Sequence, residues 1–261
     1  MTNYSEFRAK EHLGRVIGLA RKAISRVSDA YSQDWKENPS TEIRAALGYW
    51  VVCATRHFAA ITILCEEHDL SMVADTHYRQ MLEIQLQIRF YVSLDKSIWE
   101  RTAQKISAYG CIDYLEKLES IMDHPNVQHG YQEVESLLEN FDKDLIDSIR
   151  SDRAKRIWYW FGKSFSNIAD KVSRNGEDLK TLYQIQSADL HGSWGLTLGV
   201  SNPKPGSLDF RDYPDKATMY RWAADSLDLA TQTYISIWND VARNVGAPSV
   251  DISSIAQGMS D

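Results

Sequence analysis

Residues 71–95, SMVADTHYRQMLEIQLQIRFYVSLD, decide the fold of this chain. Their apolar side chains surround the axis of a predicted helix instead of forming one stripe, which is typical of a helix buried on most sides. Polar side chains nevertheless recur every four residues along one edge, at Asp75, Arg79, Glu83 and Gln87. A buried helix that carries a polar ladder is unusual, so this ladder is the first candidate for function.

The rest of the chain also has helical periodicity, without the strand–helix alternation that indicates a parallel sheet. We predict an all-α protein, a single helical-bundle domain of seven or eight helices over residues 1–245, followed by a flexible tail, 246–261. The Gly- and Pro-rich residues 192–216 form a long loop before the last helix, with room for a small hairpin, and long loops are often functional. The helices are expected at residues 3–31, 41–68, 71–95, 97–122, 131–149, 152–174, 178–190 and 217–244.

Composition is that of an ordinary globular protein, with 43% hydrophobic and 25% charged residues in 261. No apolar run reaches the roughly 18 residues of a membrane span, and the first residues lack the apolar core of a signal peptide. We therefore expect a cytoplasmic protein with no membrane partner. Cys53, Cys65 and Cys111 are odd in number and lie in apolar helical context, so reduced core thiols are expected, not disulfides.

The net charge of −7 argues against a surface coated for non-specific binding of nucleic acid. Charge is unevenly placed, however, because residues 133–147 are acidic and residues 150–174 are rich in Lys and Arg. The second segment either presents a basic face or is a solvated face neutralised by the acidic helix before it. We favour the neutralised face.

Arg79 and Glu83 lie four residues apart on the helix expected to be most buried. They must then pair, since an unpaired buried charge costs several kcal/mol. A structural salt bridge that sets helix register would explain the pair. A guanidinium held by Glu83 to face an anionic ligand would explain it equally well.

His191 ends a predicted helix and is followed by Gly192 and the long loop. An unperturbed histidine pKa of roughly 6.5 suits acid–base chemistry. The alternative is a histidine that interacts with the helix dipole. Tyr183 and Ser187 fall on the same helix face and are candidates for ordering His191 by hydrogen bonds, and Ser193 adds a further polar side chain.

The segment FGKS, residues 161–164, resembles the end of a phosphate-binding loop. That motif also needs a glycine five residues before its Gly-Lys pair, where this chain has Ile157, and a preceding strand. We therefore reject it. Gly162 is expected to allow close helix contact, and Lys163 to point into the site.

Cys53 and His57 are four residues apart, and Cys65 and His68 are three apart. Each pair offers two metal ligands, but the sequence shows no matching second pair. Signatures of zinc proteases, paired CxxC sites and nucleophile elbows are absent from the sequence. We therefore expect no metal and no cofactor.

Three motifs follow one another along the chain: Arg79-Gln-Met-Leu-Glu83, Trp160-Phe-Gly-Lys-Ser164, and residues 183–193 ending in His-Gly-Ser. In this order, over about residues 40–240, they resemble a bacterial all-helical family described as a domain of unknown function. That family is similar to the higher-eukaryote-and-prokaryote nucleotide-binding bundles, many of which are metal-independent RNases of toxin and antiphage systems. Those RNases carry an Arg four to six residues before a His. No Arg precedes His191 at that spacing, so Arg79 would have to substitute.

Two hypotheses for function follow, with a third less favoured. The first is an enzyme acting on RNA or a nucleotide, in which His191 is the general acid or base, Arg79 stabilises phosphate charge and Glu83 orients Arg79. The second is a non-catalytic binding module or homodimeric assembly module with a structural Arg79–Glu83 pair, for which 8 Trp and 13 Tyr offer interface material. The third is a metal hydrolase that uses Glu83 and His191. Physical grounds favour the module, and the resemblance favours the enzyme.

Overall fold

The computed structural model describes residues 2–38, 41–67, 74–119, 127–155, 160–162, 164–173, 179–190 and 215–257. All regular elements within these residues are helices, which confirms the predicted all-α class. Residues 192–214 of the predicted loop, with its hairpin, lie outside the described residues.

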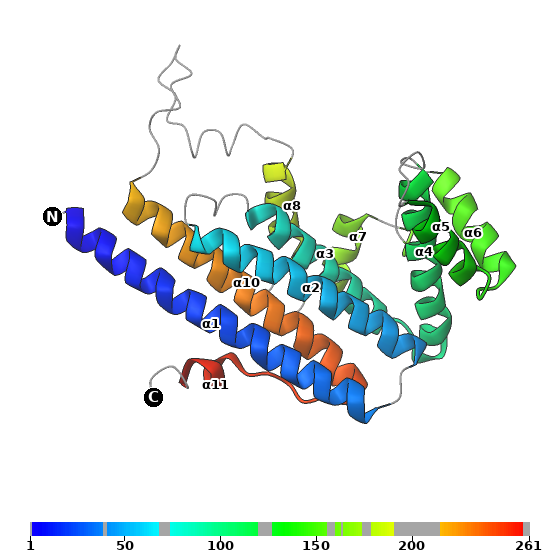
Figure 1. Ribbon diagram of the computed structural model, residues 1–261, viewed down its shortest axis with the longest axis horizontal. Helices are drawn as coiled ribbons and strands as arrows, with labels where there is room; N and C mark the ends of the chain where they lie inside the picture. The colour runs from blue at the N-terminus through cyan, green and yellow to red at the C-terminus, as the bar shows by residue number, and fades with distance from the viewer. Residues whose placement is uncertain are drawn as a thin grey trace, which may run out of the picture.

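Four long helices form a bundle (Figure 1): α1 (Thr2–Glu37), α2 (Glu42–Glu66), α3 (Ala74–Val92) and α10 (Lys216–Val245). Helices α1, α3 and α10 run in one direction and α2 runs in the other. Two hydrogen bonds of Arg44 show this arrangement for α1, α2 and α10. Arg44, at the start of α2, donates from Nη2 to the carbonyl oxygen of Asp34 near the end of α1, and from Nη1 to that of Val245 at the end of α10.

Helix α10 packs against α1, α2 and α3, and its apolar side chains are buried around most of its circumference. Tyr234 is fully buried and stacks on Phe58 of α2, with ring centroids 4.6 Å apart. The helix begins where the Asp215 side chain accepts a hydrogen bond from the backbone N–H of Thr218, and it ends at Gly246, whose φ is +79°.

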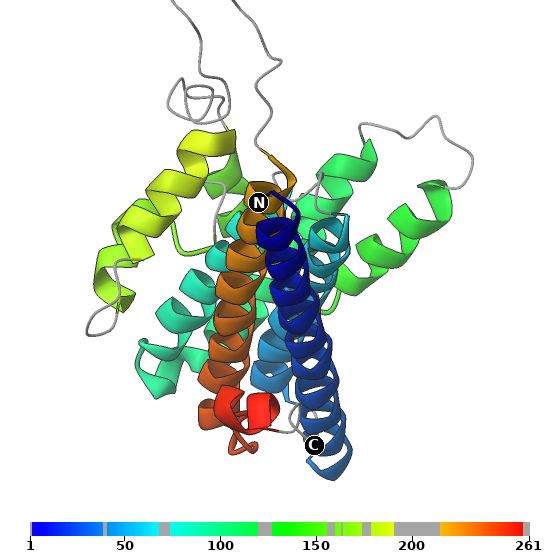
Figure 2. The same ribbon diagram turned by 90° about the vertical axis from the view of Figure 1, so that its left-hand side faces the viewer.

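Two smaller groups of helices lie on different sides of this bundle (Figure 2). The first packs on α2 through α4, and the second packs on α3. The first group comprises η2 (Lys96–Ile98), α4 (Trp99–Glu119), α5 (Val127–Leu138) and α6 (Lys143–Ala154). The second group comprises α7 (Phe165–Val172) and α8 (Leu179–Leu190).

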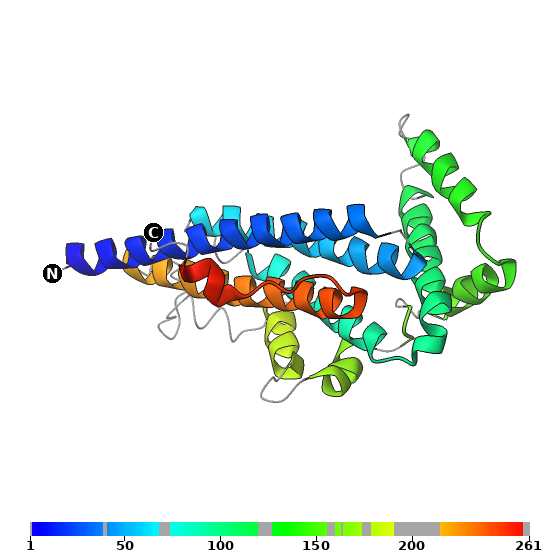
Figure 3. The ribbon, with the colours of Figure 1, turned by 90° about the horizontal axis from the view of Figure 1, so that it is seen from below.

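The described part of the predicted flexible tail is held against the bundle instead. Asn239 of α10 exchanges two hydrogen bonds with the backbone of Val250, at 2.9 and 2.8 Å. The Trp238 indole donates to the carbonyl oxygen of Pro248 at 3.1 Å. The chain then forms the short helix α11 (Ile252–Gln257), which contacts α1 (Figure 3).

The predicted single helices at residues 131–149 and 152–174 are wrong. The first is divided between α5 and α6, because the Asp142 side chain caps α6 by accepting from the backbone N–H of Asp144. The second is interrupted after α6, and α7 starts anew where the Ser164 side chain accepts from the backbone N–H of Asn167. Capping side chains inside a continuous helical pattern account for both errors.

Gly162 lies in this interruption, and its expected role in close helix contact is also wrong. A Cβ atom on Gly162 would meet no atom of the described residues within 4 Å, so none of them packs closely against it. Its φ is +64°, in the left-handed region that side chains rarely adopt. Glycine is therefore needed here for the turn before α7.

Helix α2 is the one described helix long and apolar enough to cross a membrane by length and composition. Its best window has a mean hydropathy of 1.3 and is 44% buried within the chain. Core helices of globular proteins meet the same criteria, so one such helix is a weak indication. In this chain α2 packs against α1, α3, α4 and α10.

One buried ion pair joins α3 to α10. Nε of Arg89 donates to Oδ2 of Asp240 at 2.8 Å, and the two side chains are 3% and 0% exposed. The hydroxyl oxygen of Ser236 accepts from Nη2 of Arg89 at 3.1 Å and from Nε2 of Gln85 at 3.0 Å. This polar network fixes the register of the two helices within an apolar core.

The Arg89–Asp240 pair predicts an asymmetric response to mutation. Asp240→Ala leaves a buried guanidinium without its carboxylate and should lower the free energy of unfolding by about 3–5 kcal/mol. Replacing both residues, as Arg89→Met with Asp240→Leu, should recover most of that loss. Urea denaturation followed by circular dichroism measures both changes, and an Asp240→Ala loss below about 1 kcal/mol would contradict the prediction.

Gly48 of α2 and Gly14 of α1 provide a second, matched prediction. A Cβ atom on Gly48 would lie 2.6 Å from a ring carbon of Trp35, whereas one on Gly14 would meet no described residue within 4 Å. Gly48→Ala should therefore destabilise the protein by about 1–3 kcal/mol through overpacking. Gly14→Ala should stabilise it by about 0.5–1 kcal/mol through helix propensity. Equal effects of the two substitutions in thermal denaturation would refute the close packing at Gly48.

Candidate functional site

Arg79 and Glu83 of α3 meet Tyr183 of α8, and we call these three residues the Arg79 cluster. Nε of Arg79 donates to Oε1 of Glu83 at 3.1 Å, and Nη2 donates to the Tyr183 hydroxyl at 3.2 Å. The same hydroxyl donates to Oε1 of Glu83 at 3.4 Å. The structure thus brings together three residues that the sequence analysis selected, from helices about a hundred residues apart.

The Arg79 cluster is largely buried and lies on an apolar floor. The Arg79 and Glu83 side chains are each 15% exposed. The guanidinium carbon of Arg79 lies 5.3 Å from the centre of the Tyr183 ring, which is cation–π distance. The Tyr183 ring in turn contacts Phe165 of α7, with centroids 5.6 Å apart. Phe165 belongs to a second hydrophobic cluster formed with Leu86, Ile168, Ala169, Val172 and Leu179.

Arg79 retains unused donors. A guanidinium has five N–H groups, and the contacts above engage Nε and Nη2. Among the described residues, Nη1 of Arg79 has no hydrogen-bond partner. The cluster therefore offers an oriented cation with free N–H groups, the donor pattern that phosphate and carboxylate oxygens bind.

The charges in this cluster are perturbed by burial and by one another. Burial raises the pKa of Glu83, although the nearby charge of Arg79 opposes the shift. Burial alone would lower the pKa of Arg79, but Tyr183 and Glu83 outweigh it, and its pKa is raised. Arg79 thus stays cationic, and Glu83 is the member whose protonation changes more readily.

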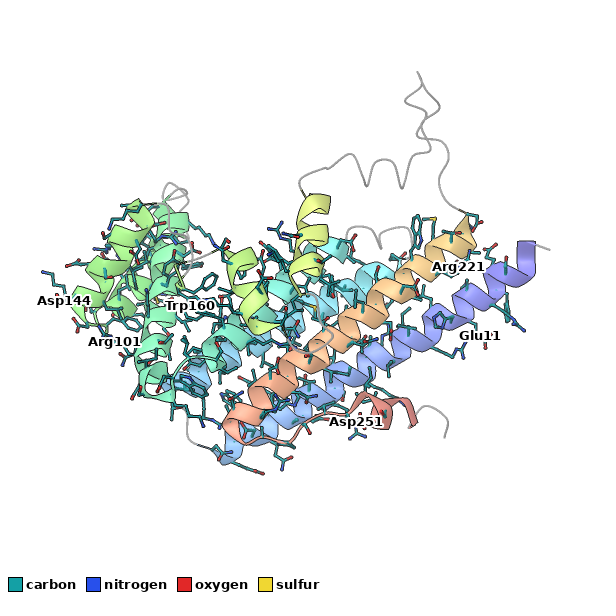
Figure 4. The ribbon with its side chains drawn as sticks, turned by 180° about the vertical axis from the view of Figure 1, so that it is seen from behind. Glu11, Arg101, Asp144, Trp160, Arg221 and Asp251 are labelled. Atoms are coloured by element: carbon teal, nitrogen blue, oxygen red, sulfur yellow. The ribbon has the colours of Figure 1, made fainter. Side chains whose placement is uncertain are left out.

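Gln87 extends the same edge of α3 to a third contact. Its Oε1 accepts a hydrogen bond of 2.9 Å from the indole N–H of Trp160, a residue labelled in Figure 4. The Trp160 ring also packs between α2 and α3, against Trp50 and Phe90. Arg79, Glu83 and Gln87 of the predicted polar ladder thus all bond to side chains that lie after α6 in the chain.

The other predicted site residues lie beyond what the structure describes. His191, Ser193 and Lys163 fall outside the described residues, and Ser187 lies within α8 but its side chain is not described. Leu190, the last residue of α8, is about 10 Å along the helix axis from Tyr183 at the usual helical rise. A meeting of His191 with the Arg79 cluster remains a prediction.

Arg153 of α6 belongs to the basic segment 150–174, and its charge is neutralised by nearby carboxylates. Its Nε donates to Glu116 at 2.8 Å and its Nη2 to Asp113 at 2.9 Å, both on α4, and the guanidinium lies 5.2 Å from the centre of the Tyr109 ring. Arg153 is therefore neutralised, but it is buried and its carboxylates come from α4, so at this residue the favoured expectation of a solvated face neutralised by residues 133–147 is wrong. A nucleic-acid surface cannot depend on Arg153.

Sequence reasoning missed one pair of titratable side chains. His57 of α2 and His77 of α3 face each other, with 3.1 Å between their Nδ1 atoms. The sequence analysis had paired His57 with Cys53 on its own helix. Spacing gave no direct signal for this pair, because His57 lies nine positions before the last residue of α2 and His77 only three positions after the first residue of α3. Among the described residues, no group of three or more His, Cys, Asp or Glu is placed to hold a metal ion.

Comparison with protein families places the chain in a family. The profile of a family described as "Family of unknown function (DUF5677)" matches residues 44–204 of the chain. The matched range contains every predicted site residue and omits α1 and α10. Neither the curated proteins nor the solved structures contain a match.

The raised pKa of Glu83 gives a pH-dependent prediction. Its folded-state pKa is above its unfolded value, so between these two values the folded protein binds more protons. The free energy of unfolding of the wild type, taken relative to that of Glu83→Gln, should therefore increase as pH falls through the interval between the two pKa values. It should decrease again as pH rises through the folded-state pKa. Urea denaturation from pH 4 to pH 8 measures the difference.

Asp113 is the matched control for this prediction. Burial alone would raise its pKa, but hydrogen bonds from Lys117 and Arg153 outweigh it, and the pKa is lowered. The stability of the wild type relative to Asp113→Asn should therefore fall as pH falls. The same pH trend for both variants would contradict the electrostatic description of Glu83.

Proposed function

Because the chain belongs to the DUF5677 family, whose function is unknown, we propose a function from its own residues. It binds a phosphate group of RNA or of a nucleotide at the Arg79 cluster and acts on that ligand as a metal-independent cytoplasmic enzyme. The observation that supports this proposal is the Arg79 guanidinium, held by Glu83 and Tyr183 while Nη1 keeps its N–H groups free of described partners.

Preorganisation makes this guanidinium suitable for phosphate. A flexible arginine loses side-chain freedom when it binds a ligand, which weakens binding. Arg79 is already ordered by Glu83 on its own helix, by the hydroxyl of Tyr183 and by the face of the Tyr183 ring. The planar guanidinium can then present parallel N–H groups to two phosphate oxygens.

The proposed reaction on RNA needs two proton transfers and stabilisation of charge. The 2′-oxygen forms a bond to phosphorus while the bond from phosphorus to the 5′-oxygen breaks. A base accepts the 2′-hydroxyl proton, and an acid donates a proton to the departing 5′-oxygen. His191 performs one of these transfers and solvent water performs the other, while Arg79 stabilises charge on the phosphate oxygens and Glu83 orients Arg79. Ser187, Ser193 and Lys163 contact the substrate.

The three motifs resemble a family of unknown function that is similar to bundles containing metal-independent RNases, and this resemblance supports the assignment. The Arg that those RNases carry four to six residues before their His is absent here, so in this proposal Arg79, from another helix, supplies the positive charge.

The second candidate is a non-catalytic module, and one observation favours it. Glu83 already neutralises the charge of Arg79 at 3.1 Å, and the neighbouring Gln87–Trp160 bond is of a purely structural kind. In this case the Arg79 cluster fastens α8 to α3, and the protein acts through binding or homodimeric assembly.

Cleavage assays on the purified chain distinguish these candidates. Labelled RNA and nucleotides are incubated with the protein in the presence of a chelator. The enzyme hypothesis predicts chelator-resistant cleavage that falls at least about 100-fold in Arg79→Lys, because lysine lacks the planar pair of donors. His191→Ala should lose activity similarly, and Arg101→Lys, at an exposed position of α4, is the matched control.

Circular dichroism and thermal unfolding of the same variants complete the test. Retained helicity with lost cleavage supports the enzyme. Full activity in both Arg79→Lys and His191→Ala, or no cleavage by the wild type, refutes it. An inactive wild type in which Arg79→Ala and Tyr183→Phe lower the melting temperature supports the structural role of the Arg79 cluster.

A further inference from the structure

The His57–His77 pair joins the two helices of the α2–α3 hairpin on a different side of α3 from the Arg79 cluster. The Nδ1 atoms are 3.1 Å apart, and the ring centroids are 5.4 Å apart. Both residues are part-buried. Within the described part of the chain, neither imidazole has another hydrogen bond or an ion pair. Two imidazoles from separate helices are thus directed at each other and at no carboxylate.

A hydrogen bond between two Nδ1 atoms requires one of them to be an acceptor with an available lone pair. When both rings are neutral, moving the donor's proton from Nδ1 to Nε2 makes both lone pairs available without net release of a proton. Histidine nitrogen binds zinc at about 2.0–2.1 Å, so two such nitrogens lie roughly 2.9–3.4 Å apart for ligand angles between right-angled and tetrahedral. The observed separation lies within this range.

We propose that His57 and His77 form a binding site for a divalent transition metal of the zinc, nickel or copper class. Imidazole suits these ions, whereas magnesium and calcium prefer oxygen ligands. Because the described residues provide no third His, Cys, Asp or Glu in ligand position, the site that they form leaves the remaining coordination positions to solvent. Such a site is open, binds more weakly than a structural zinc site, and crosslinks α2 to α3.

This metal site is independent of the proposed phosphate site. His77 and Arg79 are two residues apart, which is about 200° around a helix, so they project from nearly opposite faces of α3. His77 contacts α2, and Arg79 contacts α8. A metal between the histidines stabilises the hairpin and does not take part in the chemistry proposed for Arg79.

Zinc titration of the full chain tests the proposal. Isothermal titration calorimetry should show one Zn²⁺ per chain, and a saturating excess should raise the melting temperature by a few degrees. His57→Gln and His77→Gln should each weaken binding at least 10-fold, because each substitution removes one of the two ligands and leaves a single histidine to hold the metal. His12→Gln, at an exposed position of α1, is the matched control and should bind like the wild type. Cys53→Ser should also retain binding, which excludes the thiol one turn before His57.

A measurement on the wild type keeps the test valid if a histidine variant does not fold. In protein labelled with ¹⁵N-histidine, Zn²⁺ should shift the ring nitrogen signals of two residues together. No binding by the wild type, binding unchanged in both glutamine variants, or binding lost in Cys53→Ser but kept in those variants would overturn the proposal.

Discussion

The burial of α3 on two faces is the constraint on which the rest of the structure depends. One face packs into the main core with Met81 and Ile88 against α2 and α10. The other contributes Leu86 to the second hydrophobic cluster, under α7 and α8. A helix covered in this way can keep polar side chains only along the edges between its two partners, and each must then find a hydrogen bond. Arg79, Glu83 and Gln87 of the polar ladder occupy such an edge, and they bond to Tyr183 and Trp160.

Two arginines on α3 show what this constraint means for function. Arg89 faces α10, is 3% exposed, and bonds to Asp240 and Ser236 in a sealed network. Arg79 faces α8, is more exposed, and has an Nη1 group without a described partner. A sealed ion pair can specify helix register, but no ligand can reach it. Arg79 is therefore the better candidate for binding a ligand, whereas Arg89 has a structural role, although both are arginines of α3 that form ion pairs.

The sequence predicted long elements well and short ones poorly. The apolar periodicity of α1, α2, α3 and α10 extends over many turns, so the all-α class and the positions of these helices followed from it. Between residues 131 and 174 the same periodicity continues through two breaks. The helices are nevertheless interrupted there, by the caps at Asp142 and Ser164 and by the turn at Gly162, whose φ is positive. A single sequence does not distinguish a capping serine from a solvent-facing one.

In the candidate site, too, contacts along one helix could be predicted from the sequence, whereas contacts between distant segments could not. The Arg79–Glu83 pair was predictable because i, i+4 residues share a helix face. Tyr183 was selected for its position near His191, whereas the structure bonds it to Arg79. The Gln87–Trp160, His57–His77 and Arg89–Asp240 contacts join separate elements. Spacing along the chain contains no direct signal for such pairs, because their geometry depends on how the helices pack.

The integrity of the Arg79 cluster thus depends on residues that touch no ligand. On an isolated helix, an i, i+4 pair such as Arg79–Glu83 stabilises by only about 0.3–0.5 kcal/mol and leaves the arginine mobile. Tyr183 adds the second anchor, and it is in place only while α7 and α8 pack on α3. That packing rests on the apolar contacts of Phe165 and Leu86 beneath it. The second hydrophobic cluster therefore controls whether Arg79 is a preorganised cation or an ordinary exposed side chain, and it links the packing of α7 and α8 to the role proposed for Arg79.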